Sequence, residues 1–280
     1  YNRVQVYQKF GFNRFYYLGS KHKIAYQKKI DRSPYLSDQT AYENAIDQVK
    51  RKSGGQFINL ITMQNHYPFD KNFYNSVGFK VSGKAVPSST DQASAEDFAT
   101  GASYTDKYLK QFIKQLDAIK KPITLVWYGD HLPGIYNGDS MTQYGLELHE
   151  TDYFIYSNKY AREHGMGISK DKSAKTNYVD PSDFIAMTLK QSDSKVSAYN
   201  ALLTKIHQKL PAVTVNSFLN ATNSYNTNAE FVNRHGQVVK YDSLTKQQKR
   251  LYHDYQLVQY DITTGKHYLA KNSFMYKTVK

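Results

Sequence analysis

The sequence predicts an α/β fold, on three observations. Two mainly apolar runs, at residues 57–63 and 123–128, are rich in β-branched and aromatic residues, as in strands buried on both faces of a parallel sheet. A long stretch with apolar residues at helical spacing, 94–119, lies between them. A strand, a helix and a strand in this order predict a right-handed βαβ unit with parallel strands.

The N-terminal part of the sequence predicts three further elements. Residues 1–10 have the apolar spacing of a short amphipathic helix, which a glycine ends. Residues 14–18 are predicted to form a short strand. Ser37 and Asp38 can cap a helix whose apolar positions recur at helical spacing until the Ser-Gly-Gly sequence at 53–55.

Two helices and a strand are predicted after the second apolar run. Residues 153–156 form a short apolar strand. Asp180 before Pro181 predicts the start of a helix, because aspartate caps a helix and proline suits its first position. Another helix is predicted at 198–209.

The C-terminal part of the chain differs in composition, with frequent Ser, Thr and Asn. Residues 231–241 and 257–268 each predict a β-hairpin around a glycine-containing turn, and 244–255 predict a polar helix between them. We therefore predict two domains. The main α/β domain covers 1–211, and an appended α+β subregion with hairpins and a helix covers 212–280.

Composition and charge restrict the partners. The chain of 280 residues has no cysteine, which excludes disulfides, thiolate metal sites and a cysteine nucleophile. No apolar run approaches the roughly 18 residues that a membrane span needs. The net charge of +13 predicts an anionic partner, such as an anionic membrane or a cell-wall polymer. No nucleic-acid-binding motif is present, so nucleic acid is not an expected partner.

Two residues with metal-binding chemistry, Asp130 and His131, directly follow the apolar run at 123–128. Ligands of open α/β sheets bind at the carboxyl ends of the strands. A carboxylate oxygen and an imidazole nitrogen side by side can bind one divalent ion. The alternative is an ordinary strand-to-loop junction, in which Asp130 caps the turn and His131 is solvated.

A histidine also follows the other apolar run, since His66 comes shortly after 57–63. Neighbouring parallel strands end at the same edge of a sheet, so we expect His66 to share one pocket with Asp130 and His131. The alternative is a purely structural histidine.

Several patches together resemble the lipoteichoic acid synthase family, a branch of the alkaline phosphatase/sulfatase superfamily. The resemblance covers nearly the whole chain in order. It is carried by the segments 128–131 (Tyr-Gly-Asp-His), 63–69 (Met-Gln-Asn-His-Tyr-Pro-Phe), 1–3 (Tyr-Asn-Arg), 10–12 (Phe-Gly-Phe) and 244–266.

The resemblance implies a partial alkaline-phosphatase-like sheet with flanking helices. Members of the family sit on the extracellular face of a bacterial cell membrane, anchored by N-terminal helices. They transfer a glycerol-phosphate unit from phosphatidylglycerol to a growing glycerol-phosphate polymer. A threonine attacks the phosphorus, and a divalent metal, manganese in type, activates it.

The resemblance also assigns roles to particular residues. Asp130 and His131 are implied metal ligands. His66 is implied to bind the phosphoglycerol or the departing oxygen, and Arg3 to clamp phosphate with its planar fork. Tyr1 is an implied substrate-binding residue, at a position where such enzymes often carry a tryptophan.

The nucleophilic threonine of the family and its glutamate ligand come from a segment N-terminal to everything present here. We therefore expect no catalytic nucleophile within this chain and an incomplete metal site. The expectation is a C-terminal piece of a catalytic domain, inactive alone, without the anchoring helices.

Two other interpretations stay open. One is a sulfatase or phosphoethanolamine transferase built on the same scaffold. The other is a non-catalytic module that binds anionic cell-wall polymer through its positive charge. Salt-sensitive retention on teichoic acid, unaffected by Asp130→Ala or by a chelator, would favour the module.

Overall fold

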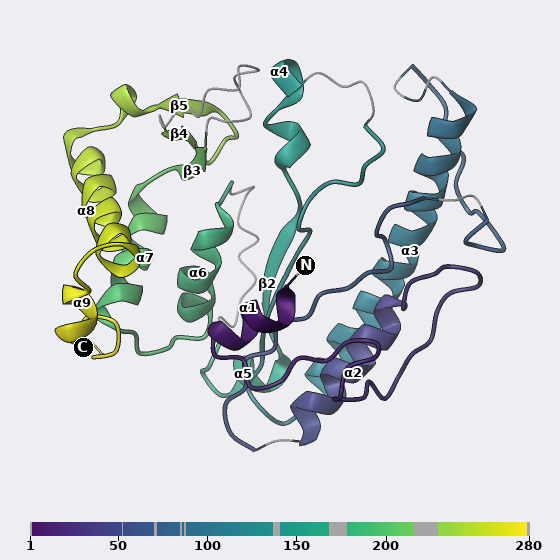
Figure 1. The fold of residues 1–280 in the computed structure, drawn as a ribbon, viewed down its shortest axis with the longest axis horizontal. Coiled ribbons are helices and arrows are strands. Elements are labelled where there is room, and N and C mark those ends of the chain that lie inside the picture. The colour runs from purple at the N-terminus through teal and green to yellow at the C-terminus, as the bar shows by residue number, and fades with distance from the viewer. Residues whose placement is uncertain are drawn as a thin grey trace. The chain divides into compact units, whose positions relative to one another are not determined.

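The chain folds into two compact units of helices and small sheets (Figure 1). The computed structural model describes residues 2–51, 53–69, 72–84, 86, 88–136, 141–167, 178–215 and 229–278. Unit 1 comprises Tyr1–Ile119 and Pro133–Asn137, and unit 2 comprises Lys120–Leu132 and Gly138–Lys280. The α/β class is confirmed. The predicted domain boundary after residue 211 is a different division of the chain and stays a prediction.

Unit 1 is built on three helices, α1 (Arg3–Lys9), α2 (Asp38–Arg51) and α3 (Ser89–Asp117), all of which were predicted. Helix α3 begins earlier than its apolar spacing indicates, because the Ser88 side chain caps it by accepting a hydrogen bond from the Asp91 amide. Helices α2 and α3 pack side by side (Figure 1).

The core of unit 1 lies between α2 and α3. The rings of Tyr42 and Phe112 stack there with their centroids 4.5 Å apart. Ile46, Leu116 and Ile119 are also buried. Burial of this apolar stripe, rather than helix propensity, is the main stabilising term for such a helix pair.

The predicted buried strand at 57–63 is wrong. These residues belong to no strand or helix, and Phe57 is 82% exposed. A strand is buried on both faces only when neighbours pair with its edges and cover its faces, and none of the described residues pairs with this segment in a ladder. The short strand predicted at 14–18 is likewise absent from the described structure.

Unit 2 contains the two other predicted strands, β1 (Thr124–Tyr128) and β2 (Tyr153–Ser157), and both are confirmed. The two strands pair antiparallel, with Thr124 opposite Ser157. The parallel βαβ unit predicted from residues 57–128 is therefore wrong. The prediction depended on a strand at 57–63, which does not form. Strand β1 is half-buried rather than buried on both faces, and its last residue Tyr128 is exposed.

Asn158 fixes the start of β1 to the end of β2. It is fully buried, and its side-chain oxygen accepts from the Ile123 amide at 3.0 Å and from the Ala161 amide at 3.1 Å. Its side-chain nitrogen donates to the Lys121 carbonyl at 2.9 Å. The same side chain therefore caps helix α5 (Lys159–Glu163) and closes the sheet.

A helical layer packs on this sheet. Phe184, the first residue of α6 (Phe184–Gln191), lies 4.9 Å ring to ring from Tyr128. Helix α6 then packs on α7 (Ala198–Lys209) and α7 on α8 (Lys246–Thr263). The apolar residues they bury together are Ala186, Leu203, Ile206, Leu210 and Leu251. The shorter helical elements of the unit are α4 (Met141–Tyr144), η1 (Glu147–His149), η2 (Pro181–Asp183), η4 (Tyr241–Ser243) and α9 (Tyr268–Lys271).

The C-terminal sheet has the antiparallel order β3-β4-β5, from β3 (Ala212–Val215), β4 (Ala229–Val232) and β5 (Val238–Lys240). The hairpin predicted at 231–241 is confirmed. The hairpin predicted at 257–268 is wrong.

The 257–268 segment is helical because α8 continues to Thr263. Gly265 follows the helix end, and its amide donates to the Tyr260 carbonyl at 2.7 Å. A Cβ on Gly265 would lie 2.7 Å from Asp261 Cα, so this close approach requires glycine. The glycine marks the stop of a helix, not the turn of a hairpin.

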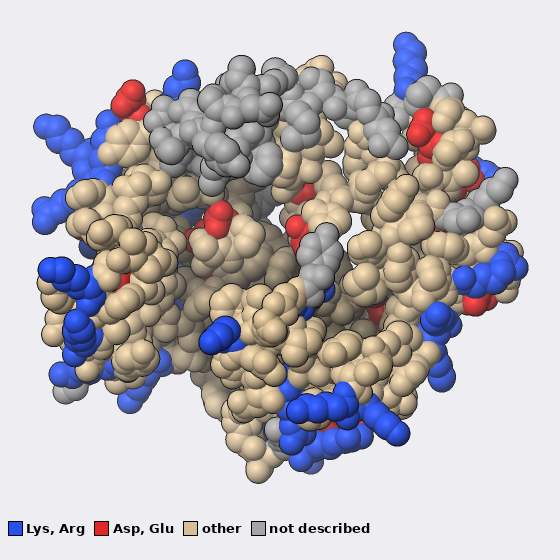
Figure 2. Space-filling model, viewed as in Figure 1, with Lys and Arg blue, Asp and Glu red and all other residues tan. Residues whose placement is uncertain are grey.

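Positive charge is spread over the surface. Lys and Arg side chains project around the visible face, with few acidic side chains among them (Figure 2). Among the described residues, no helix is both long and apolar enough to cross a bilayer.

Candidate functional site

The turn that carries His66 is anchored to two helices of unit 1. Gln64, which is buried, accepts from the Asp38 amide at 3.0 Å and donates to the Gly101 carbonyl at 2.9 Å. These bonds join the turn to the first residue of α2 and the middle of α3. The His66 amide closes the turn by donating to the Met63 carbonyl at 3.1 Å.

The hydroxyl of Thr105 is the centre of the polar cluster beneath this turn. It donates to the Asp38 carboxylate at 2.6 Å. It accepts from the Gln64 amide group at 3.1 Å and from that of Asn65 at 2.9 Å. The two residues that precede His66 therefore share one anchor on α3.

Asp38 is a buried carboxylate in this cluster, only 2% exposed. Burial raises the pKa of Asp38, while hydrogen bonds from Thr105 and Thr62 and the contact with Gln64 act in the opposite direction. Its Oδ1 atom has no hydrogen-bond partner among the described residues. Burial, together with the carboxylates of Asp97 and Asp38, also raises the pKa of the nearby Tyr74 hydroxyl.

The His66 ring is exposed and its orientation is fixed by one nitrogen. Its Nδ1 lies 2.6 Å from the Tyr67 carbonyl oxygen, which also accepts from the Tyr35 hydroxyl at 2.5 Å. A carbonyl oxygen only accepts, so Nδ1 carries the proton and Nε2 is the nitrogen presented to a ligand. The Tyr35 ring packs edge-on against His66, with centroids 5.6 Å apart.

Arg3 lies exposed on the first turn of α1, in the same unit as His66. Tyr7 ties this helix to the segment that leads to His66, because its hydroxyl accepts from the Asn59 side chain at 3.0 Å. The Phe12 and Phe57 rings add a contact with centroids 5.6 Å apart. Tyr1, the other predicted substrate-binding residue, lies outside the described residues.

In unit 2, the turn that follows β1 is held by Thr151. The Thr151 hydroxyl donates to the Gly129 carbonyl at 2.6 Å, and the Gly129 amide donates to the Asp152 carbonyl at 3.2 Å. A Cβ on Gly129 would lie 3.1 Å from the Thr151 Cβ, so the strand end packs closely against this neighbour. Asp130 and His131 follow on this fixed turn.

The Asp130 and His131 side chains lie close together and open to solvent. The His131 Nε2 is 3.8 Å from the Asp130 Oδ2, and the two side chains of His131 and Asp130 are 73% and 80% exposed. The His131 Nδ1 is 2.7 Å from the Leu132 carbonyl oxygen and so carries a proton. The lone pair of Nε2 is then available beside a carboxylate oxygen.

This pair has the donor chemistry of a divalent-metal site. A carboxylate oxygen with a neutral imidazole nitrogen suits manganese, zinc or a similar ion, and the backbone bond of Nδ1 is the usual way of orienting a metal-binding histidine. In the described part of the chain, no group of three or more His, Cys, Asp or Glu could hold a metal. A site with three or four ligands therefore needs donors beyond Asp130 and His131.

The predicted site residues divide between the two units. Arg3 and His66 lie in unit 1, whereas Asp130 and His131 lie in unit 2, where they are adjacent. The pocket that would join all of them stays a prediction, as do the individual roles.

Sequence reasoning missed the residues that support the turn of His66. Tyr35 is separated from it by more than thirty residues, and Thr105 by about forty. Asp38 was identified only as a helix cap. No local pattern signals these contacts, because they exist only once α2, α3 and the turn have packed together.

Comparison with known proteins places the chain in a family. The family model described as Sulfatase matches residues 1–194. A Staphylococcus aureus lipoteichoic acid synthase is 30% identical over 138 residues, which is 47% of this chain and 19% of that protein. A Rhizobium meliloti protein named for cyclic beta-1,2-glucan modification is 26% identical over 221 residues, 74% of this chain and 32% of its own length.

A solved structure agrees with this match over almost the entire chain. The Streptococcus pyogenes phosphoglycerol transferase GacH, in complex with sn-glycerol-1-phosphate, superposes with a TM-score of 0.74 and 30% sequence identity. The match covers 99% of this chain and 62% of GacH, so the chain spans less than two thirds of each relative named here. The chain belongs to the sulfatase family and resembles its phosphoglycerol transferases.

Proposed function

We propose that this chain is part of an extracellular, metal-dependent phosphoglycerol transferase that acts in the synthesis of lipoteichoic acid or a related cell-surface polymer. Membership of the sulfatase family and the likeness to GacH support the class of reaction. The substrates we infer are a phosphatidylglycerol-type lipid and a glycerol-phosphate polymer. GacH was solved in complex with sn-glycerol-1-phosphate, which fits this choice of substrates.

The observation that carries the proposal is the likeness to GacH, which covers 99% of this chain at 30% sequence identity and a TM-score of 0.74. The family resemblance assigns His66, Asp130 and His131 to one substrate and metal site, so we infer that all three serve the same ligand. Within unit 1, Gly134 lies against the turn of His66, since a Cβ on it would be 3.9 Å from Cδ2 of Tyr67.

Each proposed site residue has a defined chemical task. Asp130 and His131 would hold a divalent ion, which offsets charge on the phosphoryl oxygens when it is bound. The His66 Nε2, left unprotonated by the bond of Nδ1 to the Tyr67 carbonyl, would accept a hydrogen bond from a hydroxyl of the phosphoglycerol or of the departing group. Arg3 would pair two phosphate oxygens with its planar guanidinium group.

We further infer that the metal is manganese in type and that the enzyme works at the outer face of a bacterial membrane. The 280-residue polypeptide alone is expected to be inactive. The family resemblance assigns the nucleophilic threonine and a glutamate ligand to a segment outside these 280 residues.

Paramagnetic Mn²⁺ tests the shared site directly. In an NMR titration of the 280-residue chain, Mn²⁺ should broaden the imidazole signals of both His131 and His66. Asp130→Asn should remove both effects, whereas Asp47→Asn, on the surface of α2, should leave them unchanged. Broadening of His131 alone, or of neither histidine, contradicts the shared site.

Substrate turnover separates the proposed chemistry from the other interpretations. We expect no turnover of a phosphatidylglycerol lipid by this chain alone, and activity in a longer protein that includes the family's nucleophile segment. Hydrolysis of sulfate esters instead would favour a sulfatase. The +13 charge keeps the polymer-binding module as the second candidate, favoured if polymer is retained but no lipid is ever turned over.

A further inference from the structure

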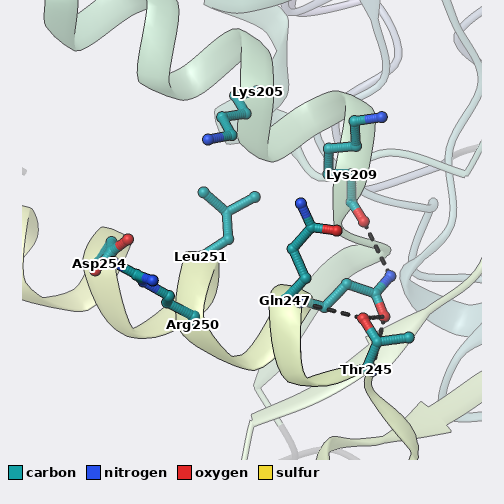
Figure 3. Close-up of a pocket in the computed structure, with 8 residues that line it drawn as sticks. Lys205, Lys209, Thr245, Gln247, Arg250, Leu251 and Asp254 are labelled. Atoms are coloured by element: carbon teal, nitrogen blue, oxygen red, sulfur yellow. Dashed lines mark hydrogen bonds between the residues drawn. The ribbon is translucent and has the colours of Figure 1, made fainter.

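A groove runs between helices α7 and α8 of unit 2, outside every residue assigned above. Its volume is about 430 Å³. Figure 3 shows Lys205 reaching from α7 toward the gap and Leu251 pointing into the same gap from α8. Leu251 is buried and forms the apolar floor, while the other residues that line the groove are polar or charged.

Helical spacing explains why these side chains meet. Lys205 and Lys209 are four residues apart and therefore lie on one face of α7. On α8, Gln247, Arg250 and Asp254 recur at intervals of three and four residues, which places them along one face as well. The groove thus presents a row of side chains from each helix.

The charges of the groove are unbalanced. Lys205, Lys209 and Arg250 line it with a single carboxylate, Asp254. None of the three cations forms an ion pair within the described part of the chain. Two lysines four residues apart on a helix repel each other, so the arrangement is unfavourable until an anion enters.

Some polar groups in the groove are already occupied, which limits what a ligand can use. Thr245 and Gln248 form the capping box of α8, and Gln248 also donates to the Lys209 carbonyl at 2.9 Å. The Gln247 amide and the three cations remain as donors. These are the groups that bind phosphate oxygens.

We propose that this groove binds a phosphodiester polyanion, specifically a soluble glycerol-phosphate chain. Its lining contains no aromatic ring on which a nucleotide base could stack. It offers successive cations along two helices, about 6 Å apart per helical turn of four residues, which suits a chain of phosphates better than one small anion. The choice of a phosphodiester with glycerol phosphate as the repeating unit rests on the proposed function, whereas the preference for a chain of phosphates rests on the row of cations alone.

The test is binding of a fluorescent glycerol-phosphate oligomer to the 280-residue chain, followed by anisotropy at constant salt. Lys205→Gln with Arg250→Gln should weaken binding by about tenfold, since each exposed charged contact contributes modestly. Asp254→Asn should strengthen it, because the only carboxylate of the groove is removed. The matched control is Lys110→Gln with Lys114→Gln, an exposed lysine pair of the same spacing on α3.

Four outcomes decide the matter. A loss confined to the groove variant, with a gain for Asp254→Asn, supports the site. An equal loss of binding in the control variant shows that the oligomer responds to the positive charge of the whole surface, which overturns the proposed site. Binding of phosphatidylglycerol vesicles but not of the oligomer, lost in the groove variant, replaces the polymer with a membrane surface and also overturns it. Equal binding of polyphosphate, whose links are phosphoanhydrides and not phosphodiesters, shows a general polyanion site and overturns the proposal while leaving the proposed function untouched.

Discussion

In His66 and His131, the position of one imidazole proton decides which nitrogen a ligand can reach. Both rings direct Nδ1 at a backbone carbonyl, at 2.6 Å and 2.7 Å. Both therefore present Nε2 in the neutral form as an acceptor or metal ligand. A ligand that binds there does not have to change the tautomer first.

The first prediction concerns the hydroxyl of Tyr35. Tyr35→Phe removes its hydrogen bond to the Tyr67 carbonyl, at a cost of about 1 kcal/mol in unfolding free energy. The His66 ring then loses part of its fixed environment. Long-range ¹H–¹⁵N NMR should show a larger share of the Nε2-protonated form for His66 than in the wild type. His131 is the internal control, and an unchanged His66 spectrum would show that Tyr35 does not orient the ring.

The second prediction concerns pH and Asp38. Burial raises the folded-state pKa of Asp38, so between its unfolded value, about 3.9, and the higher folded value the folded protein binds the extra proton. This group therefore makes stability fall as pH rises through that window.

Asp38→Asn removes the ionisation while keeping an acceptor for Thr105. The melting temperature of the variant relative to the wild type should rise from about pH 4 upward, measured by calorimetry across pH. Asp106→Asn, on the exposed side of α3, is the matched control. Parallel curves for Asp38→Asn and the wild type would contradict the prediction.

The candidate site residues could be selected only in part from the sequence, and their roles stay predictions. Asp130, His131 and His66 could be selected because each follows an apolar run and carries suitable chemistry. Tyr35 and Thr105 could not, because nothing near them in the sequence refers to the turn they support. Contacts made across many residues of chain need the packed structure.

At the scale of elements, Gly101 shows how a helix accommodates a neighbouring turn. A Cβ on Gly101 would meet the Asn65 side chain and would lie 2.8 Å from the Tyr74 hydroxyl. Glycine in a helix interior ordinarily costs about 1 kcal/mol relative to alanine. Here the close approach of Asn65 explains why alanine is unsuitable.

The third prediction follows from this packing. Gly101→Ala should lower the unfolding free energy by about 1–3 kcal/mol in urea titrations, because the overpacking outweighs the gain in helix propensity. In an Asn65→Ala background the same change should cost less, which a double-mutant cycle measures. Stabilisation by Gly101→Ala in the wild-type background would show that Asn65 can move aside freely.

The fourth prediction tests the junction at Asn158. Asn158→Ala should destabilise unit 2 by about 2–4 kcal/mol, because it removes the partner of one buried and two part-buried backbone groups, those of Ala161, Ile123 and Lys121. Asn158→Asp keeps the acceptor for the two amides and should cost less than alanine. Equal losses for both variants in urea unfolding would show that the two hydrogen bonds accepted by Asn158 contribute little and would contradict the prediction.

Elements with strong end signals were the predictable part of the fold. The Ser37 hydroxyl accepts from the Thr40 amide at the start of α2, and Asp180 caps η2. The polar helix predicted at 244–255 is the first part of α8. The segment 57–63 was misjudged because its composition indicates burial, and burial depends on neighbours that composition does not reveal. The hairpin at 257–268 failed because one glycine can end a helix as well as turn a strand.

At the scale of the whole molecule, the net charge of +13 should determine how strongly the chain binds anionic polymers. The fifth prediction is that retention on a glycerol-phosphate polymer column falls steeply between about 50 and 500 mM NaCl, because exposed charges are screened. The Lys205→Gln, Arg250→Gln variant has a net charge of +13 − 2 = +11, so it should elute earlier but remain salt-sensitive. A neutral dextran column controls for non-ionic adsorption, and salt-independent retention would contradict the prediction.

The path of the chain between its two units has a practical consequence. Pro133–Asn137 returns to unit 1 after Lys120–Leu132 has entered unit 2. No single cut of the polypeptide can release either unit whole, and a truncation after Ile119 deprives unit 1 of the segment that contains Gly134. Deletion variants that remove successive stretches of the chain will therefore disrupt folding, and a loss of activity in them would not identify functional residues. Point substitutions are the sounder tool for dissecting this protein.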